Sequence, residues 1–160
     1  MKLTHSLKAG FTFIELLVVM GVILLLTSGI IAGYNNFTDN QRLKQTALTL
    51  KTNLRFAQTK AASADKPTSG CTQLVGYAVS FTNSSYNVQA QCSEGLVGSL
   101  TSVSLPVGIS FSPIPETIVF RVLTRGTTSD NPVTLTLIGR LKSYRLEVSP
   151  KGDITDLGFQ

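Results

Sequence analysis

Residues 8–17 read Lys8-Ala9-Gly10-Phe11-Thr12-Phe13-Ile14-Glu15-Leu16-Leu17, and an apolar stretch from Val18 to Leu26 follows them directly. The acidic side chain of Glu15 is the unusual feature of this segment. A carboxylate near the start of an apolar, membrane-length helix costs about 2.5–3.5 kcal/mol on insertion scales. Such a residue is retained where something stabilises its charge, so Glu15 is a candidate functional residue.

The apolar stretch is long enough to form a membrane helix. Between Phe11 and Gly33 the polar side chains are Thr12, Glu15, Thr27 and Ser28. At about 1.5 Å per residue, a helix over these residues reaches about 34 Å, which spans a hydrocarbon core. We therefore expect residues 11–33 to form a transmembrane helix, as the first half of a longer helix.

The segment around Gly10 resembles the prepilin signal of type IV pilin-like proteins. In that family a membrane peptidase cuts after the glycine and methylates the new N-terminus. The resemblance implies that residues 1–10 are a leader peptide, that cleavage separates Gly10 from Phe11, and that Phe11 is N-methylated. It also implies that Glu15 pairs with the Phe11 amine of a neighbouring subunit during assembly, because an unpaired buried charge is expensive.

Two other interpretations of the N-terminus stay open. An ordinary secretory signal peptide would explain the basic residues Lys2 and Lys8, although Glu15 interrupts its apolar region and no Ala-x-Ala-like site follows Leu26. An uncleaved, membrane-anchored surface protein is the other alternative.

A second helical pattern follows the apolar stretch. Small and apolar residues recur at spacings of three and four, at Leu43, Ala47, Leu50, Leu54, Ala57 and Ala61. This spacing places them on one stripe of an amphipathic helix. We expect one helix over about residues 11–64, with residues 34–66 as its amphipathic half, because Asp65-Lys66-Pro67 and Thr68-Ser69-Gly70 are helix-breaking.

Residues 67–160 are predicted to form a β-rich globular head. From Val75 onward the apolar pattern has period two, with Asn83-Ser84 as a hairpin turn. Further strands are expected at 100–105, 107–111, 117–123, 133–138 and 143–149. One face of the amphipathic half should pack on this antiparallel sheet, which gives an α+β fold. The resemblance likewise implies the type IV pilin fold.

Two cysteines, Cys71 and Cys92, flank the predicted hairpin. A disulfide between them would close a loop of about 20 residues and contribute on the order of 3 kcal/mol. Two free, buried thiols are the alternative. The cysteines form no Cys-x-x-Cys pair and the only histidine, His5, lies in the leader, so no metal site is expected.

Basic residues are unevenly distributed, since residues 67–120 contain no lysine or arginine. Arg140 and Lys142 follow Gly139 in a predicted turn, where both could contact DNA through its phosphates. Tyr144 is the nearby candidate for base stacking. A solvated face, or charge complementarity with neighbouring subunits, is the commoner explanation of such residues.

Three further segments suggest a subfamily. Residues 54–61, 138–140 and 146–154 look like the GspH/FimT group of minor pilins and pseudopilins. DNA-binding members of that group carry a Gly-Arg-x-Arg motif in the C-terminal tail. Here the tail has Gly152 followed by Asp153, which departs from the motif and puts DNA uptake in doubt.

The sequence therefore predicts a structural subunit of a type IV pilus or a type II secretion pseudopilus. A major pilin and a DNA-binding minor pilin for competence are the alternatives. Expected partners are other pilin or pseudopilin subunits, the prepilin peptidase and the inner-membrane assembly platform. The chain should be a single-pass membrane protein before assembly and part of a filament afterwards. No nucleophile–base pair or phosphate loop is recognisable, so neither catalysis nor a cofactor is expected.

Overall fold

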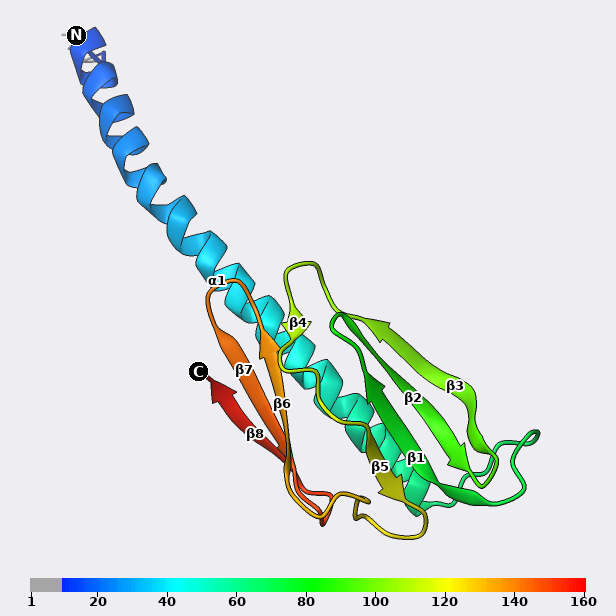
Figure 1. Ribbon diagram of the computed structural model, residues 1–160. Helices are drawn as coiled ribbons and strands as arrows, with labels where there is room; N and C mark the ends of the chain where they lie inside the picture. The colour runs from blue at the N-terminus through cyan, green and yellow to red at the C-terminus, as the bar shows by residue number, and fades with distance from the viewer. Residues whose placement is uncertain (1–9) are drawn as a thin grey trace, which may run out of the picture. The chain divides into compact units, whose positions relative to one another are not determined.

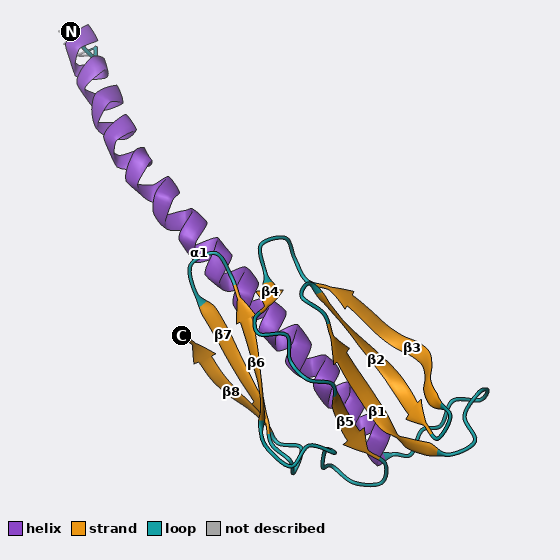
Figure 2. Cartoon of the chain, in the orientation of Figure 1, coloured by secondary structure: helices purple, strands orange, loops and turns teal. Residues whose placement is uncertain are grey.

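The computed structural model of the chain describes residues 10–160. The chain divides into two compact units, one ending at Thr38 and the other comprising Asp39–Gln160. One helix, α1 (Phe13–Ala62), contributes residues to both units, and eight strands follow it (Figures 1 and 2). The predicted leader, residues 1–10, lies outside the described residues except for Gly10.

In the N-terminal unit, α1 begins at Phe13, and the side chains at its start are exposed. Every side chain from Phe11 to Thr27 is exposed, and the Thr27 hydroxyl donates a hydrogen bond to the carbonyl oxygen of Ile23 (2.7 Å). Among the described residues, no helix is both long enough and apolar enough to cross a membrane. The expectation that residues 11–33 form a transmembrane helix is therefore not supported.

In the second unit, α1 buries the stripe that the sequence predicts. The six residues of this stripe are each at most 1% exposed: Leu43, Ala47, Leu50, Leu54, Ala57 and Ala61. Three of the six are alanines, whose small side chains let the helix approach the strands closely. Burial of apolar surface stabilises a fold by about 25 cal/mol per Å². Because the whole stripe is buried, it is a main stabilising contact of the unit.

The helix ends two residues earlier than expected, at Ala62. Ala64 adopts a left-handed backbone (φ 52°), and the Asp65 amide donates to the carbonyl oxygen of Lys60 (3.1 Å). Asp65 also pairs with Lys60 through its side chain, and its backbone oxygen accepts from the Tyr77 hydroxyl. The turn after the helix is thus tied to the first strand.

The strands form two antiparallel sheets, where we expected one. The first sheet has the order β3-β2-β1-β5, from β1 (Leu74–Phe81), β2 (Ser85–Cys92), β3 (Gly95–Ser104) and β5 (Ile118–Arg121). The second has the order β4-β6-β7-β8, from β4 (Ser110–Phe111), β6 (Val133–Ile138), β7 (Ser143–Val148) and β8 (Ile154–Phe159). The inner faces of both sheets and the stripe of α1 share one apolar core.

Several strand limits differ from the prediction. The β1–β2 hairpin turns at Asn83-Ser84 as expected, with the Thr82 amide donating to the Ser85 carbonyl oxygen (2.8 Å). β3 begins at Gly95, five residues earlier than predicted, because Gly98 (φ 62°) and an irregular register opposite Val88–Ala90 hide its period-two pattern. β4 is shorter than predicted and β8 was not predicted at all.

Candidate assembly and processing site

The peptide bond between Gly10 and Phe11 lies outside any helix. Both residues precede the first helical residue, Phe13, and both are exposed. A Cβ added at Gly10 would meet no atom within 4 Å. An exposed, non-helical bond of this kind is accessible to a peptidase, because cleavage requires an extended backbone.

Thr12 is the N-cap of α1. Its side-chain oxygen accepts a hydrogen bond from the backbone amide of Glu15 (3.3 Å), three residues on. This Thr-x-x-Glu spacing is that of a capping box, and an acidic residue in the first turn interacts favourably with the helix dipole. The structure thus gives Glu15 a local role at the start of the helix. The Thr-x-x-Glu spacing indicates this role, but it was not predicted from the sequence.

Exposed apolar side chains surround the helix between Phe11 and Leu26. Phe11 and Phe13 are 81% and 83% exposed, and Ile14 is 70% exposed. Phe11 also lines a shallow apolar hollow with Leu16, Val19, Met20 and Ile23. Contiguous exposed apolar surface on this scale marks an interaction surface. The predicted residues Phe11 and Glu15 both lie at its N-terminal end.

Cys71 and Cys92 form a disulfide, with their Cα atoms 5.5 Å apart. The bond joins the segment after α1 to the end of β2. Beside it, the backbone amide of Thr72 donates to both carboxylate oxygens of Glu94 (3.1 and 3.2 Å). Hydrogen bonds from Thr72, foremost from its side chain, and from the backbone of Glu94 lower the pKa of Glu94 to about 2.

Arg140 and Lys142 are brought together on the exposed turn between β6 and β7. The Gly139 amide donates to the Lys142 carbonyl oxygen (2.9 Å), which closes the turn. The Lys142 ammonium lies 5.6 Å from the centre of the Phe159 ring, a cation–π contact. Both residues are exposed, so both are accessible to an anionic partner.

Tyr144, the nearby candidate for base stacking, is not available for it. Its side chain is 3% exposed and its ring packs edge-on against Phe159, with centroids 4.9 Å apart. Burial, and a hydrogen bond and charge interaction with Asp156, raise the pKa of Tyr144 to about 12. Asp156 lies in β8, and its carboxylate also pairs with Lys51 (3.9 Å).

The tail at Gly152 has a structural role that sequence reasoning missed. Gly152 adopts a left-handed backbone (φ 88°), and a Cβ there would lie 1.7 Å from the Arg125 carbonyl oxygen. Gln58 of α1 donates hydrogen bonds to the carbonyl oxygens of Arg125 and Gly152 (2.9 Å each). In this chain the glycine lets two loops meet beside the helix.

Comparison with known proteins identifies the N-terminal segment. Residues 5–31 match the model of the prokaryotic N-terminal methylation motif. Searches of curated proteins and of solved structures gave no match. The motif indicates a type IV pilin-like protein that is processed as a prepilin, and such a protein assembles with other pilin subunits. Residues 5–9 of the match lie outside the described residues.

Proposed function

We propose that this chain is a structural subunit of a type IV pilus or a type II secretion pseudopilus. The prepilin peptidase cleaves it after Gly10, Phe11 is N-methylated, and the subunit assembles through the exposed apolar face of its N-terminal helix. The observation that carries the proposal is the methylation motif at residues 5–31, together with the exposed, non-helical bond that precedes α1.

Glu15 is proposed to act in assembly. The new ammonium of Phe11 lies four residues before it in the chain, and both residues are exposed in the single chain. When neighbouring helices pack, the two charges would be desolvated, and pairing between subunits then avoids the cost of burying either alone. The capping hydrogen bond is made by the backbone amide of Glu15 and not by its carboxylate.

The remaining roles follow from the same proposal. We propose a minor subunit of the GspH/FimT kind, held at the cell membrane before assembly and exported in the filament, with no catalytic activity of its own. Its partners are other subunits, the peptidase and the inner-membrane assembly platform. A major pilin remains the alternative within this class.

A DNA-binding minor pilin is the second candidate function. The exposed pair Arg140 and Lys142 favours it, and the buried ring of Tyr144 and the acidic Asp153 after Gly152 speak against it. Replacing both cations by alanine tests this candidate: a DNA receptor loses affinity and the slope of its salt dependence falls by about 2.

The test of the main proposal is intact-mass spectrometry of the chain made in cells that contain prepilin peptidase. The expected product begins at N-methylated Phe11. Gly10→Val should abolish processing without disturbing the fold, because the position is open. Gly21→Ala is the matched control, since its surroundings are equally open and it lies beyond the cleavage site. An intact N-terminus in the unmodified chain, or a cut beyond Gly33, would overturn the proposal.

A further inference from the structure

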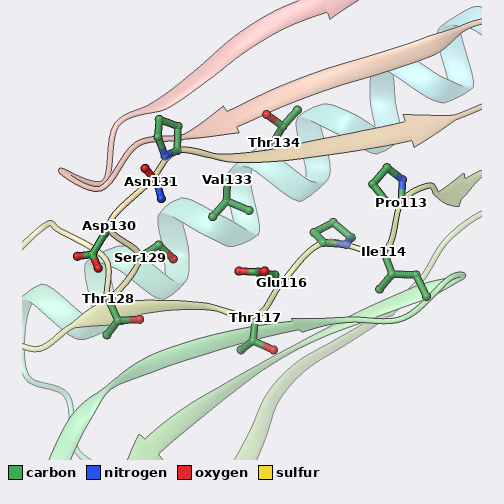
Figure 3. Close-up of a pocket in the computed structure, with 12 residues that line it drawn as sticks. Pro113, Ile114, Glu116, Thr117, Thr128, Ser129, Asp130, Asn131, Val133 and Thr134 are labelled. Atoms are coloured by element: carbon green, nitrogen blue, oxygen red, sulfur yellow. The ribbon is translucent and has the colours of Figure 1, made fainter.

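A hollow of about 760 Å³ opens in the second unit between the two sheets. Its lining comes from residues 113–117, which lead into β5, and residues 128–134, which lead into β6 (Figure 3). β5 is an edge strand of its sheet, so the hollow lies where the two sheets approach one another without pairing.

One wall of the hollow is a stretch of β6 that pairs with β7 on one edge and with no described strand on the other. The short strand β4 pairs only with Leu137 and Ile138, and the Ser112 amide then donates to the Thr136 carbonyl oxygen (3.2 Å). Thr134, two residues earlier, presents its backbone on the same edge. No described strand pairs with it there, and Pro113 has no amide hydrogen to offer. An unpaired edge of this kind is a template for another segment of chain.

The lining is acidic and predominantly polar. It includes Glu116 and Asp130 but no lysine or arginine. Within residues 10–160 neither carboxylate takes part in an ion pair. Ile114, on the same wall as Glu116, is 55% exposed (Figure 3). A partner that fits this lining must bring positive charge.

The turn at the other end of β6 has that chemistry. Arg140, Leu141 and Lys142 are all exposed, and Leu141 is 57% exposed. The turn follows Ile138, the last residue of β6, whereas the hollow is lined by Val133 and Thr134, its first residues. At about 3.3 Å per residue, turn and hollow are roughly 20 Å apart, so they cannot meet within one chain.

We propose that the Gly139–Lys142 turn of one copy docks into the hollow of a second copy, with Arg140 and Lys142 facing Glu116 and Asp130. The two surfaces differ, so the contact is heterologous, and repeating it produces an open chain of heads rather than a closed dimer. The inference rests on the proposed function as a filament subunit. It requires in addition that two copies of this chain are neighbours in the filament, and it names the contact between their heads.

Cysteine cross-linking of the full chain tests the contact. Two differently tagged copies, one with Leu141→Cys and one with Asn131→Cys, are produced together in cells containing prepilin peptidase and oxidised. The expected product of the two copies together is a mixed, disulfide-linked dimer. Each single variant produced alone should stay monomeric. A chain with both substitutions should form a series of disulfide-linked oligomers of increasing size. Thr155→Cys, on the exposed part of β8, is the control partner for Leu141→Cys and should give no product.

Charge reversal then identifies the contacts. Glu116→Lys with Asp130→Lys on the Asn131→Cys copy should lower the mixed product about tenfold or more, because like charges would face each other. Arg140→Glu with Lys142→Glu on the other copy should restore it. Efficient dimers of Leu141→Cys alone, or charge reversal without effect, would overturn the contact.

The same sample separates this inference from the proposed function. Its intact mass reports whether Phe11 is the methylated N-terminus. A processed chain without the mixed product overturns the head contact and leaves the proposed function standing. An unprocessed chain overturns the proposed function. The presence or absence of the mixed disulfide-linked dimer then shows whether the heads associate.

Discussion

The side-chain amide of Gln58 donates a hydrogen bond to the carbonyl oxygen of Gly152, across 2.9 Å and 94 residues of sequence. The same amide nitrogen donates to the carbonyl oxygen of Arg125. The Thr127 amide donates to the Pro150 carbonyl oxygen nearby (2.9 Å). One side chain of α1 thus donates to a carbonyl oxygen in each of two loops, and ties the loop between β7 and β8 to the helix.

Gly152→Ala should strongly destabilise the second unit. The left-handed backbone at φ 88° costs an L-residue about 1–2 kcal/mol. The added Cβ would also lie 1.7 Å from the Arg125 carbonyl oxygen, so the loops must move, which costs about 1–3 kcal/mol more. Urea unfolding of the full chain in mild detergent measures the free energy of unfolding.

Gly108→Ala is the matched control for this substitution. Its backbone is equally left-handed (φ 86°), but a Cβ there meets no atom within 4 Å. It should therefore show the conformational cost alone. Equal destabilisation by the two substitutions would mean that the close approach at Gly152 is unimportant.

Gln58→Ala should lower the free energy of unfolding by about 1–3 kcal/mol, because two carbonyl oxygens lose their donor. Gln41→Ala removes an exposed glutamine of the same helix for which the described residues show no side-chain hydrogen bond, so it should change stability by less than about 0.5 kcal/mol. Thermal unfolding of the two variants compares them directly. Similar melting temperatures would argue against the bridging role of Gln58.

The helix could be predicted from sequence because its signals are local. The spacing of Leu43, Ala47 and Leu50 repeats with the period of one element, and every residue of the predicted stripe is buried. The Thr12–Glu15 capping box was equally legible from its spacing. It was missed because Glu15 was interpreted only as the partner of a neighbouring subunit's Phe11 amine, and not as a residue that stabilises its own helix.

The division into two sheets could not be predicted in this way. Which strands pair depends on contacts between distant residues, such as Thr134 with Glu147, and period two is the same in either sheet. β8 contains Asp156 and Gly158, which are typical of loops. Tertiary contacts override that tendency, because Asp156 meets Lys51 and Tyr144, and Phe159 packs on the Tyr144 ring.

Replacing Cys71 and Cys92 together by serine should destabilise the second unit by about 3 kcal/mol, because the bond closes a loop of 21 residues in the unfolded chain. Both positions are largely buried, so the serine hydroxyls add a further cost. The control is reductant: it should lower the denaturant midpoint of the unmodified chain and leave the double variant unchanged. A reductant effect of equal size on both would show that the disulfide is not its cause.

The carboxylate of Glu94 should make stability depend on pH at the acidic end. Its pKa in the folded chain is about 2, below the unfolded value of about 4.3. Because the folded pKa is the lower one, the stabilisation is fully present above the unfolded pKa and is lost as the pH falls through about 2.

Glu94→Gln keeps the size of the side chain and removes the charge. The difference in denaturant midpoint between the two chains should therefore be constant above about pH 5 and should disappear toward pH 2. A difference that persists unchanged at pH 2 would mean that the hydrogen bonds from Thr72 do not distinguish the charged carboxylate from a neutral side chain.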